Sequence, residues 1–382
     1  MKIEILQDIA VSANLDRNDS GLVCAYPTTC RLRNGDVICV YRQGTLKHSH
    51  DGVLVQQRSS DGGVSWSEPS SLFDGMRMTQ PESVHTGVIG QLANGAVLSL
   101  LRTFEVKSPQ SYIFSEEGRK LRHQLYVVRS VDDGRTWLKP EPRQLEGAPR
   151  DHYVGSRPLG MANGNFLVPV EATGEHGQQI ALAAILSDRG EPLQPLITCA
   201  EDKTGRIGYG DPRVTLLPDG RVVMLLWTYV NATEETLPVH RFVSADNGRT
   251  WSGPLNTHVP SQIMSPLSLG SNRLIAASNI RTELAGIWLW CSSDAGETWN
   301  LDSPIQMWDA HEEVMKGKPR SGRIGAAQKT SERIWNVLPN FTFGTPDLVR
   351  LDDKLFLLTY YATRNGIIHI RACRFGLEGG GL

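Results

Sequence analysis

The chain has 382 residues and a formal net charge of −2, from 39 basic and 41 acidic side chains. Because the two signs are interspersed, no basic stripe is available for nucleic acid, and binding to a polyanion is disfavoured. No apolar run is long enough to span a membrane, and the first residues lack the pattern of a leader peptide. We therefore expect a cytoplasmic protein without membrane contact, and its oligomeric state stays open.

A pair of apolar strands joined by a tight turn recurs along the chain. The first pair, at 28–42, turns at Asn34-Gly35, and Asn-Gly or Asp-Gly dipeptides are typical of two-residue hairpins. Five further pairs follow, at 86–102, 155–171, 211–227, 265–281 and 345–361. Each pair is followed by two shorter strands, so the sequence predicts six units of four strands.

Six such units predict an all-β fold, a six-bladed β-propeller that forms a single domain over residues 1–375. The leading MKIEILQDIAV alternates like a strand, and we expect it to pair with a terminal blade and close the ring. The glycine-rich residues 376–382 are expected to form a flexible tail.

A second motif closes the outer strand pair of four units. It reads Ser-x-Asp-x-Gly-x-Ser/Thr-Trp at 59–66, 130–137, 244–251 and 292–299. In the third unit only SDRG (187–190) survives, and the sixth unit has lost the motif. The Asp side chain is expected to cap backbone NH groups, Gly to adopt positive φ and Trp to pack over the turn. These aspartates are therefore predicted to be structural rather than catalytic: Asp61, Asp132, Asp246 and Asp294.

The six cysteines have no spacing typical of a metal site, and most lie in apolar, strand-like runs. We expect buried free thiols and neither metal nor cofactor. The cysteines are Cys24, Cys30, Cys39, Cys199, Cys291 and Cys373.

The repeated Ser-x-Asp-x-Gly-x-Thr-Trp turn resembles the Asp box of the sialidase superfamily, whose members are six-bladed propellers with BNR repeats. The resemblance spans nearly the whole chain and implies a carbohydrate-active enzyme. Such turns mark the architecture rather than the activity, so the function has to be argued from the site.

Propellers bind ligands at one mouth of the central channel, where innermost strands begin and second strands end. In this chain those positions, and the loop LKHSHD (46–51), are rich in charged and aromatic residues. Catalytic candidates are the acids Asp51, Glu171 and Asp211. Candidates for substrate binding are Arg42, His50, Glu82, His85, Arg102, Arg157, Arg213, Trp227, Arg281 and Tyr361.

The sialidase pattern can be carried over position by position. Asp51 resembles the acid/base Asp of the first-blade loop, and Asp211 stands where the family has the Glu of Asn-Glu-Pro. Ala25 occupies the position of the first carboxylate-binding arginine, Trp227 that of the second, and Thr345 that of the nucleophilic Tyr. The resemblance thus implies a related enzyme for which sialic acid is not the preferred sugar.

The remaining side chains predict an exo-acting glycoside hydrolase, since this chemistry needs two carboxyl groups, one with a raised pKa. The mouth arginines could clamp a carboxylate of an acidic glycan terminus. Two alternatives stay open. Histidines and tyrosines at the mouth, such as His48, His85, Tyr26 and Tyr153, could perform β-elimination in a uronate-type polysaccharide lyase. The propeller could also bind glycans without catalysis.

Overall fold

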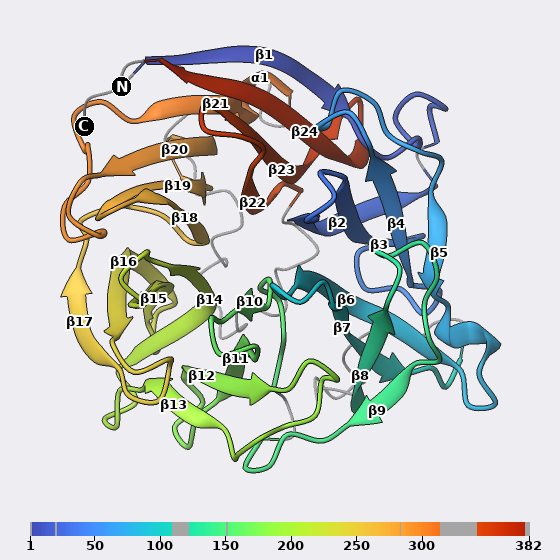
Figure 1. Ribbon diagram of the computed structural model, residues 1–382, viewed down its shortest axis with the longest axis horizontal. Coiled ribbons are helices and arrows are strands. Elements are labelled where there is room, and N and C mark those ends of the chain that lie inside the picture. The colour runs from blue at the N-terminus through green and yellow to red at the C-terminus, as the bar shows by residue number, and fades with distance from the viewer. Residues whose placement is uncertain are drawn as a thin grey trace.

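The computed structural model describes residues 2–19, 21–108, 122–149, 152–282, 284–313 and 342–378. In these residues the chain forms six four-stranded antiparallel sheets, arranged around a common axis (Figure 1). The predicted all-β, six-bladed propeller is therefore confirmed. Among the described residues, helix is limited to the 3-10 turn η1 (Gly75–Arg77) and to α1 (Ala310–Glu313).

The first three blades follow one another along the chain, with the innermost strand first. Blade 1 contains β2 (Val23–Arg31), β3 (Val37–Gly44), β4 (Val53–Ser59) and β5 (Ser70–Phe73). Blade 2 contains β6 (Glu82–Gln91), β7 (Val97–Glu105), β8 (His123–Ser130) and β9 (Glu141–Arg143). Blade 3 contains β10 (Leu159–Gly160), β11 (Phe166–Thr173), β12 (Gln179–Leu186) and β13 (Ile197–Ala200).

The last three blades complete the ring. Blade 4 contains β14 (Ile207–Leu216), β15 (Val222–Val230), β16 (Glu235–Ser244) and β17 (Ser252–Asn256). Blade 5 contains β18 (Met264–Gly270), β19 (Arg273–Ile280), β20 (Gly286–Ser292) and β21 (Ile305–Asp309). Blade 6 contains β22 (Gly344–Arg350), β23 (Leu355–Arg364), β24 (Ile367–Glu378) and, as its outermost strand, β1 (Lys2–Ala10).

The N-terminal strand closes the ring, as the sequence predicts. Strand β1 pairs antiparallel with β24, in a register that runs from Lys2 opposite Glu378 to Ala10 opposite Arg371 (Figure 1). The last blade is thereby built from both ends of the chain. Strand β24 continues past the predicted boundary at residue 375, and residues 379–382 of the predicted tail lie outside the described residues.

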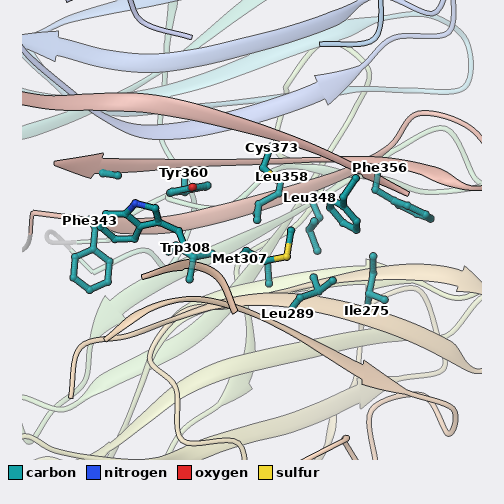
Figure 2. Close-up of a cluster of buried hydrophobic side chains, with 14 of the residues drawn as sticks. Ile275, Leu289, Met307, Trp308, Phe343, Leu348, Phe356, Leu358, Tyr360 and Cys373 are labelled. Atoms are coloured by element: carbon teal, nitrogen blue, oxygen red, sulfur yellow. The ribbon is translucent and has the colours of Figure 1, made fainter. Parts of the chain in front are cut away.

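The hydrophobic core is divided among the interfaces between blades. Six buried clusters occur in the described residues, each contributed by two neighbouring blades. Figure 2 shows the cluster between blades 5 and 6, where Trp308 packs against Phe343 and Tyr360. Because each sheet buries apolar side chains on both faces, the strands read as nearly continuous apolar runs.

All six cysteines are free and buried, as predicted. Burial raises the pKa of the Cys24 thiol to about 12, although a hydrogen bond from Ser12 opposes the shift. Such thiols stay protonated and unreactive near neutral pH. They therefore act as small apolar residues of the core.

The Asp-box turns have the predicted geometry. The Asp132 carboxylate accepts hydrogen bonds from the Thr136 hydroxyl at 2.6 Å and from the Thr136 backbone NH at 2.9 Å. These bonds hold the pKa of Asp132 well below its usual value. Asp246 accepts the same two bonds, from Thr250, at 2.6 and 2.9 Å. The motif thus fixes a tight turn at the outer edge of its blade.

The tryptophans of the last two Asp boxes pack against their own turns, whereas Trp137 donates through Nε1 to Gln56 Oε1 of blade 1 at 3.0 Å. Trp251 and Trp299 donate through Nε1 to the backbone oxygens of Gly248 and Gly296, at 3.0 and 3.1 Å. Trp299 is 7% exposed, whereas Trp251 is half-buried. These contacts identify the box residues as structural elements of the rim.

Candidate functional site

Four of the six innermost strands carry a bulge at the channel mouth. The register of pairing with the second strand shifts at four places: Ala25–Thr28 in β2, Val84–Thr86 in β6, Gly210–Arg213 in β14 and Gly344–Asp347 in β22. A bulge redirects a side chain that regular pairing would bury in the sheet. The four redirected residues all line one cavity: Tyr26, His85, Asp211 and Thr345.

Three of these residues precede a proline and have left-handed backbone conformations. Their φ angles are 59° at Tyr26, 47° at Asp211 and 44° at Thr345. This region is uncommon for residues with a Cβ and costs about 1–3 kcal/mol each. The strain is kept where three blades present side chains to the same space, which is typical of a functional site.

The cavity lies at the mouth of the channel and has a volume of about 620 Å³, including the solvent at its open side. Buried polar atoms without a hydrogen-bond partner in the described part of the chain occur in its wall, at His85 Nδ1, Gln179 Oε1 and Thr345 Oγ1. Each costs about 1–3 kcal/mol, which indicates that the wall serves binding or catalysis rather than stability.

Glu171, at the mouth end of β11, has both carboxylate oxygens bound by neighbours. Oε1 accepts a hydrogen bond from Gln179 Nε2, and Oε2 accepts one from the Asp211 backbone NH, each at 2.6 Å. Glu171 is 4% exposed and lines the cavity. Two short bonds to a carboxylate favour its charged form and fix its orientation.

Asp211 presents the second carboxyl group to the cavity. Burial raises its pKa, and Arg213 and Arg281 oppose this shift. Arg213 Nη2 lies 3.6 Å from Asp211 Oδ1 and is held by a bond from Nη1 to the Gly155 backbone oxygen at 2.7 Å. The Asp211 side chain is 20% exposed and lines the cavity, and burial outweighs the two arginines in setting its pKa.

Histidine and tyrosine rings from blades 1 to 3 form another part of the cavity wall. The Tyr26 hydroxyl and His48 Nε2 are hydrogen-bonded at 3.0 Å, and the His48 and His85 ring centroids are 5.0 Å apart. Tyr153 packs against His85 at 5.2 Å. Burial lowers the pKa of both histidines well below 6.5, and nearby cations, Lys47 for His48, lower it further. Both rings are therefore neutral at physiological pH.

Two cations converge on Tyr361, the candidate for stacking from β23. Lys47 Nζ donates to the Tyr361 hydroxyl at 3.3 Å and Arg281 Nη2 donates to it at 3.5 Å. Arg281 Nη1 also donates to Gln262 Oε1. Burial lowers the pKa of Lys47 well below 10.5. Trp227 adds an aromatic face beside Asp211.

Three candidates belong to the structure of the first-blade loop instead. Arg42 is fully buried and donates to the backbone oxygens of Val84, Leu46 and Ser49. The Asp51 carboxylate accepts from the Thr45 backbone NH at 3.1 Å and from the Ser49 hydroxyl at 2.5 Å. Neither these two residues nor the half-buried His50 is among the described residues that line the cavity. The structure thus places the Asp51 carboxylate in hydrogen bonds within its own loop and outside the described lining of the cavity.

Arg157 closes the channel beneath the cavity. It crosses from blade 3 and donates to the backbone oxygens of Thr29 in blade 1 and Leu348 in blade 6, at 3.0 and 2.9 Å. Its Nη2 lies 3.4 Å from Asp347, which itself accepts from the Thr29 NH at 2.8 Å. Arg157 thus ties three blades together, and it is not among the described residues that line the central cavity.

The remaining two candidates lie over blade 2. Glu82 accepts a hydrogen bond from the Thr103 hydroxyl at 2.6 Å and lines a separate, more open cavity with Tyr126. Arg102 is buried near His85, where its charge contributes to the low pKa of that histidine. Both lie outside the described lining of the central cavity.

The sequence did not point to Gln179. It is the first residue of β12, a third strand, whereas the candidates came from the ends of first and second strands and from the loop at 46–51. A signal was available at Gly210, because a glycine inside a strand often marks the close approach of another group. A Cβ at Gly210 would lie 2.3 Å from Gln179 Oε1.

The searched part of the chain gives no sign of a metal or a membrane segment. Among the described residues, no group of three or more His, Cys, Asp or Glu side chains is arranged to hold a metal ion. The described helices are also too short to cross a membrane.

Three solved structures share the fold at low sequence identity. A protein of unknown function from Dyadobacter fermentans DSM 18053 is 18% identical, with a TM-score of 0.74 over 98% of this chain and 99% of that one. The Hadza microbial sialidase Hz136 is 14% identical, with a TM-score of 0.69 over 97% and 68%. An α-L-arabinanase from Penicillium chrysogenum, complexed with arabinobiose, is 15% identical, with a TM-score of 0.62 over 97% and 98%.

At these identities the likeness shows the sialidase-like propeller fold alone. A search of curated protein sequences gave no match. The family model described as the BNR repeat-like domain matches residues 110–357. This match covers more than half of the chain and includes three of the four Asp-box turns, and the chain therefore belongs to the BNR repeat-like family of sialidase-like propellers.

Proposed function

We propose that the protein is a glycoside hydrolase that removes the terminal sugar of an acidic or complex glycan. The observation that carries this proposal is the pair formed by Asp211 and Glu171. Asp211 has a raised pKa, and Glu171 is held by two short hydrogen bonds that favour its negative charge. Glycosidases need such a pair, one carboxyl group protonated and the other charged.

In this mechanism Asp211 protonates the oxygen of the departing group as the bond between that oxygen and the anomeric carbon breaks. The carboxylate of Glu171 stabilises the positive charge that develops on the sugar ring. It then either bonds to the anomeric carbon or takes a proton from the attacking water. Arg213 keeps the Asp211 carboxyl group in place.

The other cavity residues support a sugar ligand. Trp227 and Tyr361 offer aromatic faces, and Arg281 brings positive charge beside Tyr361. Two of the similar structures are those of a sialidase and of an arabinanase complexed with arabinobiose, both named for activity on sugars. Because Ala25, Trp227 and Thr345 replace the sialidase residues, sialic acid is not the preferred sugar.

A screen of turnover tests this proposal. Purified protein is offered 4-nitrophenyl glycosides, a sialoside and uronate-containing polysaccharides, and released sugar is measured by chromatography. We expect release of a terminal sugar from at least one glycan and little or none from the sialoside. Efficient sialoside turnover would contradict the substrate assignment, and no sugar release from any member would contradict the hydrolase.

A specific observation favours a lyase as the second candidate. The hydrogen bond between Tyr26 and the neutral His48 pairs a proton donor with a base inside the cavity. In β-elimination the base removes the proton next to a uronate carboxylate, a double bond forms, and a tyrosine hydroxyl protonates the leaving oxygen. The same screen distinguishes the two reactions, because only elimination gives an unsaturated product that absorbs ultraviolet light. Glycan binding without any product would indicate a binding propeller.

A further inference from the structure

Gln179 occupies an unusual position for a polar side chain. It is the first residue of β12 in blade 3, is 3% exposed, and lines the cavity beside the two carboxyl groups. Its Nε2 donates to Glu171 Oε1 at 2.6 Å, whereas its Oε1 has no hydrogen-bond partner in the described part of the chain. Because a carboxylate only accepts, this contact fixes which end of the amide faces Glu171.

The backbone of Gln179 is held from the neighbouring blade. Its NH donates to the Tyr229 hydroxyl at 3.2 Å, and Tyr229 belongs to β15 of blade 4. Blade 4 also supplies the Asp211 NH that binds the other oxygen of Glu171. The position of the Glu171 carboxylate therefore depends on how blade 3 packs against blade 4.

Two glycines in β14 leave the room that this arrangement needs. A Cβ at Gly208 would lie 2.2 Å from the Tyr229 ring, and a Cβ at Gly210 would lie 2.3 Å from Gln179 Oε1. Glycine weakens a strand interior, so its presence at both positions is explained by the side chains that approach it. In the segment GYGD (208–211), Gly208 thus leaves space for Tyr229 and Gly210 leaves space for Gln179, and the segment ends in Asp211.

We propose that Gln179 is a positioning residue, which holds the Glu171 carboxylate charged and correctly oriented for the reaction. Gly210 supports it by leaving space for the amide. One end of this buried amide has no partner in the described part of the chain, so its bond to Glu171 is what accounts for its position. The catalytic part of this inference rests on the proposed function, whereas the hold on Glu171 does not.

The first experiment needs no substrate. The carboxylate band of Glu171 is followed by infrared titration, identified by its loss in Glu171→Gln. In Gln179→Met, which keeps the length but not the hydrogen bond, we expect Glu171 to take up its proton at a higher pH than in the wild type. Gly210→Ala should shift the titration in the same direction, because it displaces the amide.

Matched controls separate this effect from loss of local structure. Gln178 is also buried, but it faces the other way, accepting from the His176 NH and donating to the Asp202 backbone oxygen. Gln178→Met should leave the Glu171 titration unchanged. Gly376→Ala in β24 should also leave it unchanged, because a Cβ there would lie 3.9 Å from the nearest atom. An unchanged titration in Gln179→Met, or an equal shift in Gln178→Met, would overturn the inference.

The second experiment uses the glycan that the turnover screen identifies. We expect Gln179→Met to lower kcat by about 10²-fold, while KM changes by less than about threefold, because a misplaced catalytic group affects the chemical step. The acidic limb of the kcat profile should also move to higher pH. A change in KM alone would contradict a positioning role. If the screen finds no turnover, the proposed function fails while the infrared titration still decides whether Gln179 holds Glu171.

Discussion

The rim and the channel mouth of the propeller show opposite patterns of residues at equivalent positions. At the rim, the Asp-box turns repeat the same hydrogen bonds, such as those of Asp132 and Asp246 with the threonine four residues later. At the mouth, the equivalent bulges of four blades carry four different side chains, Tyr26, His85, Asp211 and Thr345. Identical residues at equivalent positions indicate a shared structural task, whereas different residues on one backbone geometry indicate a site.

The largest effect is expected from a comparison of mouth and rim aspartates. If Asp211 is the general acid, Asp211→Asn should lower kcat by about 10²–10⁴-fold for glycans with poor leaving groups. Activated aryl glycosides should be affected much less, because their leaving groups need little protonation. The rim variant Asp246→Asn is the control and should leave kcat unchanged. Similar losses in both variants would contradict the division into rim and mouth.

Substituting a rim tryptophan tests the other side of the comparison. Trp299→Ala should reduce the free energy of unfolding by about 3 kcal/mol, because it empties a buried site beneath the turn. Turnover per folded molecule should stay at the wild-type value. Urea unfolding and steady-state kinetics on the same sample measure the two quantities. A stable variant with impaired turnover would place Trp299 in the function of the protein instead.

The pH dependence of stability should separate the two regions. The pKa of His85 is lowered in the folded protein. Below pH 6.5 the unfolded chain therefore binds a proton that the folded chain does not bind, and the free energy of unfolding decreases as the pH decreases. For one histidine that stays neutral, the loss between pH 7.5 and 5.5 is about 1.4 kcal/mol. In His85→Gln, the decrease in the free energy of unfolding between pH 7.5 and 5.5, measured by urea unfolding, should be smaller by that amount. An identical loss in the variant would mean that His85 is protonated in the folded protein.

Rim carboxylates act in another pH window. Burial raises the pKa of Asp246, but hydrogen bonds from Thr250 and Ser244 outweigh this effect and lower the pKa to about 2. Its contribution is therefore complete above pH 3.8 and is lost as the pH falls toward 2. Asp246→Asn should accordingly change the acid unfolding midpoint below pH 4 and leave the slope between pH 7.5 and 5.5 unaltered.

The smallest effect is expected at Asp51. Burial raises the pKa of Asp51, but hydrogen bonds from Ser49 and Thr45 outweigh this effect and lower it below the usual value. A lowered pKa suits a charged carboxylate that caps the loop rather than a proton donor. Asp51→Asn should therefore lower kcat by less than about tenfold on both natural and activated substrates. A loss of about 10²-fold or more confined to poor leaving groups would restore Asp51 as the general acid.

Repetition made the fold predictable. The Asn-Gly turn at 34–35 and the Trp of each Asp box are local signals, readable without knowing what lies nearby. The candidate site was predicted less completely. Glu171, Asp211 and Arg281 lie where strand ends were expected to meet, but Arg42 and Arg157 bind backbone oxygens instead. Nothing local in the sequence distinguishes an arginine that faces a cavity from one that closes a channel.

The sequence by itself determined the number of blades, the turns at their rims and the strand ends that surround the channel, because each depends on residues close together in the chain. Only the tertiary structure decided which mouth residues share a cavity. The contact between Gln179 and Glu171 depends on Tyr229 and Gly210 from the next blade, and the raised pKa of Asp211 depends on its burial. Orientation and charge at the site arise from packing between blades, which local sequence patterns do not specify.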